Sequence, residues 1–106
     1  MVVNMRKYRN YKEDLIEKLK DSEYAAAYLN ACLEESSEAN DMGIFQLAVR
    51  DVVEAHGGMG AVSAKMGVNR ESFYRSLSQK GKARFSTLVN AIRACDLELA
   101  FLPAHS

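Results

Sequence analysis

Positively charged and hydroxyl-bearing side chains are concentrated in the stretch GAVSAKMGVNRESFYRSLSQ, which covers residues 60–79 of the 106-residue chain. Its second half holds two arginines, a tyrosine and several serines. Guanidinium groups pair with phosphates and with guanine edges, and hydroxyl and amide groups contact phosphates and base edges. The chemistry that these residue types favour is therefore the binding of nucleic acid.

Two short helices joined by a tight turn must position these side chains. The pattern predicts the first helix over about residues 61–66 and the second over about residues 70–78. Gly67 suits a turn with a positive φ because glycine has no Cβ to clash, and Asn69 is a suitable N-cap for the second helix. The apolar side chains that two crossing helices could share as a small core are Val62, Met66, Val68, Phe73 and Leu77. This layout is that of a helix-turn-helix, whose second helix enters the major groove of DNA.

On a helical wheel the second helix has two different sides. Phe73 and Leu77 share one side, and polar residues occupy the other side and its flanks. We expect contacts to bases and phosphates from Asn69, Arg70, Glu71, Ser72, Tyr74 and Arg75. The loop that follows, QKGKAR, is basic, and we expect phosphate contacts from Lys80, Lys82 and Arg84. An ordinary helical hairpin with a solvated polar face and a solvated loop is the alternative.

The charges of the chain are segregated although its formal net charge is zero. Residues 59–93 hold seven basic side chains and one acidic side chain, whereas residues 11–58 hold four basic and eleven acidic ones. The basic block coincides with the predicted helix-turn-helix, so the near-neutral pI does not argue against DNA binding. Residues 1–10 hold three basic side chains and no helical stripe, and we expect them to form a flexible basic arm.

The remainder, residues 11–106, is predicted to be a single all-α domain with five helices. Besides the two helices above, apolar spacing predicts helices over about residues 23–35, 40–56 and 86–95. Ser36-Ser37 should end the first of these, and Gly57-Gly58 the second. Residues 11–20 fit a short helix or a packed extended segment equally well.

Each of these three helices has an apolar stripe that should face the core. In the first helix the stripe consists of Tyr24, Ala27, Tyr28, Ala31 and Cys32, widened by Leu29 and Leu33. In the second it consists of Phe45, Ala48, Val49, Val52 and Val53. In the last it consists of Phe85, Leu88, Val89, Ile92 and Cys95.

In the C-terminal segment, residues 97–103, one set of side chains alternates with another, which indicates a short extended strand. The first set is Leu97, Leu99, Phe101 and Pro103, and the second is Glu98, Ala100 and Leu102. A lone strand cannot satisfy its own backbone, so it needs a partner. A second copy of the chain would supply that partner and also the second half-site reader that helix-turn-helix proteins usually need. We therefore expect a homodimer with the C-terminal segment or the last helix at its interface.

Other function classes find little support in the composition. No apolar run is long enough for a membrane span and the first ten residues lack the apolar core of a signal peptide, so a cytoplasmic location is expected. Cys32 and Cys95 lie far apart and fit buried free thiols better than a disulfide or metal site. His56 falls in the last turn of its predicted helix, where a structural role is expected. No catalytic residue, metal site or cofactor is predicted, and an enzyme is not expected.

Four stretches in a fixed order resemble a known family: EYAAAYLNACLEE, FQLAVRDVVEAHGGM, GAVSAKMGVNRESFYRSL and ARFSTLVNAIRACDLEL. Over roughly residues 11–100 the chain resembles the antitoxin, or antidote, proteins of bacterial addiction modules. The resemblance implies a fold similar to phage-repressor DNA-binding domains, a small basic partner toxin encoded by the neighbouring gene, and repression of the shared operon. Two features depart from the family's pattern: the loop QKGKAR is longer than usual, and Ser63 stands where helix-turn-helix proteins usually have alanine.

A basic toxin would be attracted to the acidic surface formed by Glu34, Glu35, Glu38 and Asp41, for which a merely solvated face is the alternative. The predicted function is that of a DNA-binding antitoxin, which neutralises a cognate toxin and represses its own operon at a double-stranded operator. The alternatives are a general helix-turn-helix transcriptional regulator and a protein-interaction module without DNA binding. The basic block over residues 65–93 favours DNA binding.

Overall fold

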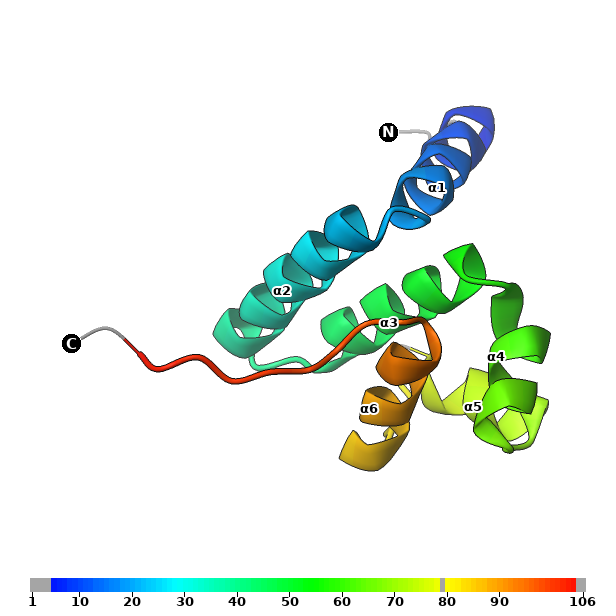
Figure 1. The fold of residues 1–106 in the computed structure, drawn as a ribbon. Helices are drawn as coiled ribbons and strands as arrows, with labels where there is room; N and C mark the ends of the chain where they lie inside the picture. Colours follow the sequence, from blue (N-terminus) through cyan, green and yellow to red (C-terminus); the bar gives the residue numbers. More distant parts are fainter. Residues whose placement is uncertain (1–4, 79, 105–106) are drawn as a thin grey trace.

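Six α-helices make up the fold in a computed structural model that describes residues 5–78 and 80–104. They are α1 (Met5–Leu19), α2 (Ser22–Ala39), α3 (Gly43–Ala55), α4 (Gly58–Met66), α5 (Arg70–Ser76) and α6 (Phe85–Ala94) (Figure 1). No β-strand occurs in these two described ranges. The all-α prediction is confirmed. The predicted count of five helices is wrong, because residues 11–20, for which the pattern allows two conformations, belong almost entirely to α1.

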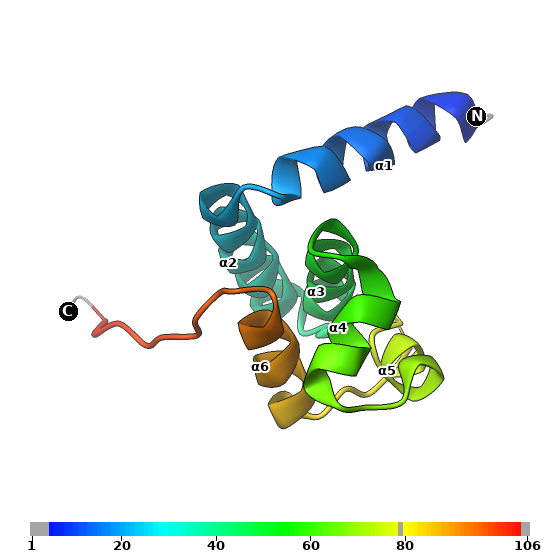
Figure 2. The same cartoon turned by 45° about the vertical axis from the view of Figure 1, so that its right-hand side comes forward.

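α1 begins inside the segment that is expected to be a flexible arm. Residues 1–4 of that segment lie outside the described residues, whereas residues 5–10 belong to α1. The second half of α1 packs on the core, where Leu19 is fully buried and Leu15 and Ile16 are partly buried. A helix held by such a packed half can extend into a polar segment, because each further residue adds a backbone hydrogen bond. Figure 2 shows the N-terminal half of α1 projecting away from the other helices.

The end of α2 differs from the prediction because of Ser36. The helix continues past this residue to Ala39, and Asn40 then ends it in the left-handed conformation with a φ of 53°. Ser36 is fully buried, and its Oγ accepts a hydrogen bond from the backbone N of Phe45 at 2.7 Å. A serine ends a helix by diverting its hydroxyl to the local backbone. Here that hydroxyl is engaged by α3 instead, so the helix is not interrupted.

The buried face of α2 is rotated relative to the predicted stripe. Ala25 is fully buried and Leu29 is 7% exposed, and the small side chain of Ala25 allows a close approach to the rest of the core. Apolar residues cover much of the circumference of α2, so periodicity alone does not select the face that contacts α3. Tyr28 and Cys32 of the predicted stripe are half-buried, whereas Tyr24, Ala27, Ala31 and Leu33 are exposed.

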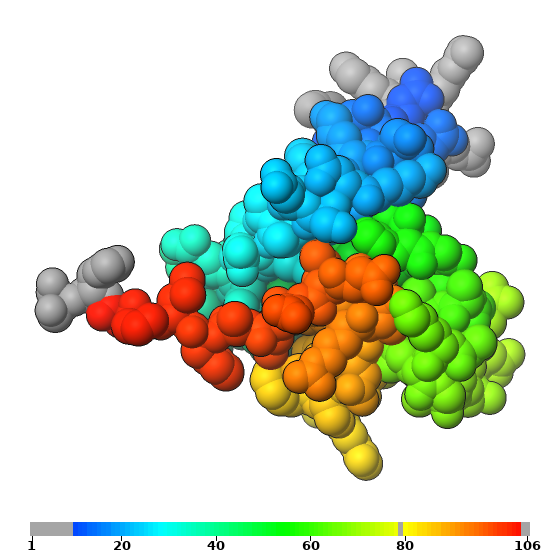
Figure 3. All heavy atoms as spheres, in the orientation of Figure 1, coloured from blue at the N-terminus to red at the C-terminus, as the bar shows by residue number. Residues whose placement is uncertain are grey.

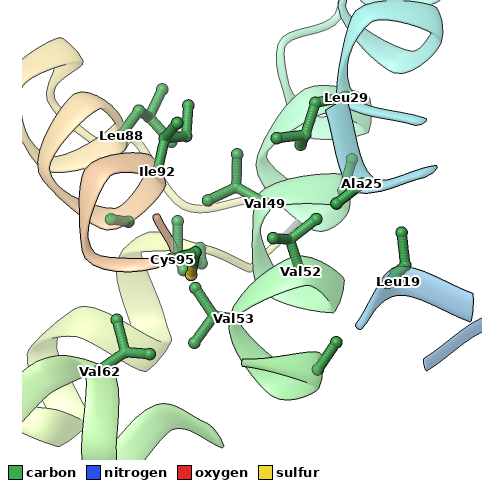
Figure 4. Close-up of a cluster of buried hydrophobic side chains, with 14 of the residues drawn as sticks. Leu19, Ala25, Leu29, Val49, Val52, Val53, Val62, Leu88, Ile92 and Cys95 are labelled. Carbon is green, nitrogen blue, oxygen red and sulfur yellow. The ribbon is translucent and has the colours of Figure 1, made fainter. Parts of the chain in front are cut away.

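α3 lies at the centre of the fold and packs against α1, α2, α4 and α6. Every member of its predicted stripe is buried, as expected: Phe45, Ala48, Val49, Val52 and Val53. Figure 4 shows the valines of α3 between the side chains of α6 on one side and those of α2 on the other. Gly57 and Gly58 follow α3 with φ values of 113° and 90°, which confirms the predicted glycine stop.

The C-terminal segment, residues 97–104, has no regular secondary structure, so the predicted strand is wrong. Residues 97–99 line a cavity of 140 Å³ between α2, α3 and α6, and within this segment Leu97 and Leu99 are partly buried whereas Glu98 and Ala100 are exposed, so burial alternates there without a strand. Phe101 and Leu102 are 89% and 87% exposed and lie on a tail that extends past the end of α2 (Figure 3). Of the predicted last stripe, Leu88 and Ile92 in α6 and Cys95 directly after it are buried, Val89 is partly buried, and Phe85, the first residue of the helix, is exposed.

Candidate nucleic-acid interface

α4 and α5 are joined by a three-residue turn, residues 67–69, as the sequence predicts. Gly67 has a φ of 73° at the end of α4, a conformation that favours glycine. Asn69 caps α5, because its Oδ1 accepts a hydrogen bond from the backbone N of Ser72 at 2.9 Å. Val68 is 44% exposed in the turn, so its predicted place in the shared core is wrong. α4 is longer and α5 is shorter than predicted.

The two sides of α5 differ in the predicted way. Phe73 is 3% exposed, and Leu77, which directly follows the helix, is fully buried. These two buried side chains pack α5 against the core. The side chains exposed on the rest of the helix are Arg70, Glu71, Ser72, Tyr74 and Arg75. We call this set the outward face of α5. Its arginine, serine and tyrosine side chains can donate hydrogen bonds to phosphates and base edges, and the carboxylate of Glu71 can accept one from a base.

A surface hollow of 390 Å³ lies on the outward face of α5 and is lined by Arg70, Glu71, Tyr74 and Arg75. Two guanidinium groups against one carboxylate give this hollow a net positive charge. A further cation, Arg50 on α3, contacts Tyr74 without lining the hollow, because its guanidinium carbon lies 4.2 Å from the centre of the Tyr74 ring. In the sequence Arg50 belongs to the acidic block, and no local pattern connects it with α5.

The basic loop between α5 and α6 is held by one buried side chain, Gln46 of α3. Its Nε2 donates to the carbonyl oxygen of Gly81 at 2.7 Å and to that of Ser78 at 3.2 Å. Its Oε1 accepts a hydrogen bond from the backbone N of Ala83 at 3.0 Å. Gln46 is only 4% exposed, so these hydrogen bonds compensate for the burial of its amide. Gln46 is not among the residues predicted from the sequence, although a glutamine directly after Phe45 in an apolar segment is a recognisable signal.

Gly81 allows the same loop to pass directly against the end of α5. A Cβ added at this position would lie 2.4 Å from the carbonyl oxygen of Arg75 and 2.5 Å from that of Ser76, which leaves no room for a side chain. The loop is therefore packed on the C-terminal end of α5. All three cations that were predicted to contact phosphates are exposed on this loop: Lys80, Lys82 and Arg84.

A second hollow, of 290 Å³, separates α5 from the loop and from the start of α6. Its lining consists of Val68, Asn69, Ser72, Phe73, Ser76, Lys82, Arg84 and Thr87. The predicted site residues thus lie in two groups. Those in the first hollow belong to α5 alone, whereas Asn69 and Ser72 are brought together with Lys82 and Arg84 in the second. Lys80 lines neither hollow.

The cysteines and the histidine, which could support catalysis or metal binding, have other surroundings in this fold. Cys32 and Cys95 are free cysteines, half-buried and buried respectively, and burial raises the pKa of Cys95 to about 11. The Nε2 of His56 lies 2.9 Å from the carbonyl oxygen of Leu19 and so links the ends of α3 and α1. Within residues 5–78 and 80–104, no group of three or more His, Cys, Asp or Glu residues could hold a metal ion. In the same ranges, none of the helices combines the length and apolar character that a membrane crossing requires.

The fold and the surface described above define a small all-helical protein that presents a basic two-helix unit. The family model described as "Probable addiction module antidote protein" matches residues 9–103, and the chain belongs to this family. Membership implies a toxin as a partner. A Haemophilus influenzae protein named "Uncharacterized protein" is 28% identical over 85 residues, which are 80% of this chain and 82% of that protein. No solved structure matches the chain.

Proposed function

We propose that this chain is a sequence-specific DNA-binding antitoxin, which neutralises a cognate toxin and represses its own operon. The DNA-binding part rests on the outward face of α5, which is exposed while Phe73 and Leu77 hold the helix on the core. Membership in the antidote family supports the antitoxin part. The arrangement of α3, α4 and α5 is compatible with the phage-repressor-like fold that the family resemblance implies.

Base contacts and phosphate contacts are divided between two sets of residues in this proposal. Arg70 and Arg75 contribute most to the reading of bases, assisted by Asn69, Glu71, Ser72 and Tyr74. The loop cations Lys80, Lys82 and Arg84 contact phosphates, where they contribute affinity without sequence preference. Removing one of these three should reduce the slope of log affinity against log salt by about 0.9, on every DNA sequence alike.

The toxin is assigned to the acidic surface at the C-terminal end of α2. Its members are exposed: Glu34, Glu35, Glu38 and Asp41. Complementary charge accelerates and orients association with a basic partner. Figures 1 and 2 both show α2 and α5 on different sides of α3, so one copy can offer both surfaces at once.

A homodimer is part of the proposal, because two-fold symmetric operators are read by two recognition helices about 34 Å apart. Phe101 and Leu102 support an interface at the C-terminal segment, since the monomer leaves both side chains almost fully exposed. Apolar side chains of this size are among those that contribute most when they are buried at an interface.

The test of DNA binding compares wild type with Arg75→Ala on a duplex taken from the region directly upstream of the chain's own gene. Loss of a bidentate base contact should weaken binding to the upstream duplex by about 1–3 kcal/mol, and binding to a random-sequence duplex should weaken less. Lys18→Ala is the control, because it removes one positive charge from an exposed position on α1. Equal affinity of wild type and Arg75→Ala for the upstream duplex would contradict the base-reading role.

The antitoxin part is tested separately, by co-expressing the chain with the product of the neighbouring gene. Rescue of growth together with co-purification is the expected result. A chain that binds the toxin but discriminates no DNA would be a protein-interaction module, and a chain that binds its operator but no toxin would be a general transcriptional regulator.

A further inference from the structure

Arg50 is a cation from outside the two-helix unit that is held against the outward face of α5. Its guanidinium carbon lies 4.2 Å from the centre of the Tyr74 ring, and its Nη2 donates a hydrogen bond to the Tyr74 hydroxyl. A guanidinium over an aromatic ring gains a cation–π interaction in addition to the hydrogen bond. The two contacts together fix the position of Tyr74, which is 45% exposed.

The guanidinium of Arg50 keeps donors that its contacts within the chain do not satisfy. Its Nε is buried and has no hydrogen-bond partner. The Oε1 of Glu54 lies 3.6 Å from this Nε, a distance at which the two groups attract but do not form a hydrogen bond. A guanidinium has five N–H donors, and the Arg50 side chain is 24% exposed, so part of this capacity is accessible from solvent.

Glu54 neutralises Arg50 only in part, because it has a second cationic neighbour. Its Oε2 lies 3.7 Å from the Nζ of Lys12 on α1. Around Tyr74, by contrast, positive charge accumulates, since Arg70 and Arg75 line the same hollow as the tyrosine. The helix that carries Tyr74 thus presents two guanidinium groups against the one carboxylate of Glu71, and Arg50 adds a third guanidinium beside the ring. An excess of positive charge attracts anions, and the anion that DNA offers along both sides of its grooves is the backbone phosphate.

We propose that Arg50 belongs to the DNA interface, where it positions Tyr74 and donates to a backbone phosphate. The inference rests on the proposed function, in which α5 faces the DNA. A phosphate is the partner rather than a base, because Arg50 lies on α3 and reaches only the flank of the helix assigned to the groove. Glu54 competes with that phosphate for the guanidinium, so removing the carboxylate should strengthen DNA binding.

The experiment compares Arg50→Met with Lys18→Met on the upstream duplex and on a random-sequence duplex, over a range of salt concentrations. Both changes remove one positive charge, but Lys18 lies on α1 beside Asp14. Arg50→Met should weaken binding to both duplexes about tenfold, as expected for a charge-assisted hydrogen bond, and should reduce the salt slope by about 0.9. Lys18→Met should change neither quantity. Tyr74→Phe should weaken binding and leave the slope unchanged, because the charge is retained.

Glu54→Gln is the variant with the opposite expected sign. Loss of a partly exposed carboxylate beside Arg50 should tighten binding to both duplexes about twofold. If Arg50→Met binds like Lys18→Met while Arg75→Ala is impaired, the inference fails and the proposed function stands. If wild type binds neither duplex, both fail. Should Arg50→Met not fold, as judged by circular dichroism, Glu54→Gln decides: unchanged or weaker binding by this variant overturns the inference.

Discussion

Replacing Gln46 by methionine should release the basic loop while keeping the core filled. Methionine has an unbranched side chain of similar length, so the change removes mainly the amide. The variant loses three hydrogen bonds: two that the amide donates to the carbonyl oxygens of Ser78 and Gly81, and one that it accepts from the backbone N of Ala83. At about 0.5–1.5 kcal/mol for each, the loss of stability should be about 1.5–4.5 kcal/mol. For a domain of this size, the melting temperature should then fall by about 6 °C or more.

Limited digestion with trypsin reports on the loop itself, because trypsin cleaves after lysine and arginine and the loop holds Lys80, Lys82 and Arg84. Local opening exposes a segment to proteases before the whole domain unfolds. Arg6, Lys7 and Arg9 offer trypsin sites near the N-terminus in every variant, so cleavage within residues 1–10 is disregarded throughout the comparison. In Gln46→Met the first cleavage elsewhere, located by mass spectrometry, should therefore fall within residues 80–84. In wild type this segment should be protected at the same protease concentration.

The control for this experiment is Leu29→Ala in α2. Leu29 is 7% exposed, and its truncation should cost about 2–5 kcal/mol, comparable with the effect at Gln46. It leaves the hydrogen bonds of Gln46 in place, so its cleavage should not begin in the loop. A common first cleavage site in both variants, or a loss of less than about 0.5 kcal/mol in Gln46→Met, would show that Gln46 does not hold the loop.

Three further predictions concern other parts of the fold. Gly81→Ala should lower the melting temperature by an amount that corresponds to about 1–3 kcal/mol, because the new Cβ meets backbone at 2.4 Å; an unchanged melting temperature would contradict this packing. In sedimentation experiments the full chain should be a dimer and a chain cut after Asp96 a monomer; two monomers would contradict the dimer, and two dimers would place the interface elsewhere. The folded protein holds the Cys95 proton up to a pKa of about 11, whereas the unfolded thiol titrates near 9.0, so stability in urea should fall as the pH rises between these values. This loss of stability with rising pH should be smaller in Cys95→Ala. An equal loss in both proteins would show that groups other than Cys95 cause it.

Features with local causes were predictable from the sequence. The cap at Asn69 and the turn at Gly67 follow from residue type alone, and both are confirmed. The stripe of α3 was predictable because α3 is contacted from several sides, so its apolar residues are all buried whichever neighbour they meet. The α5 stripe was equally clear, since Phe73 and Leu77 are the two apolar positions on a helix that is otherwise polar apart from Tyr74.

Features that depend on distant parts of the chain were not predictable in this way. Ser36 is a helix breaker by type and becomes a helical residue only because Phe45 engages its hydroxyl. Gln46 and Arg50 reach the loop and α5 across more than twenty residues of sequence, so no window contains both partners. The C-terminal alternation predicted a strand wrongly because partly buried and exposed positions can alternate without a ladder of hydrogen bonds.

The separation of the two sides of α5 bears on how such a protein can diversify. Phe73 and Leu77 fix the helix, and neither belongs to its outward face. Residues of the outward face can therefore be exchanged in evolution, or by an engineer, at little expense to folding, because surface substitutions usually change stability by less than about 0.5 kcal/mol. Arg70 and Arg75 are free to vary in this sense, whereas Tyr74 is tied to Arg50 on α3. A library that randomises the outward face while retaining Tyr74 should thus yield many folded variants on an unchanged scaffold, and under the proposed function these variants should differ in DNA preference.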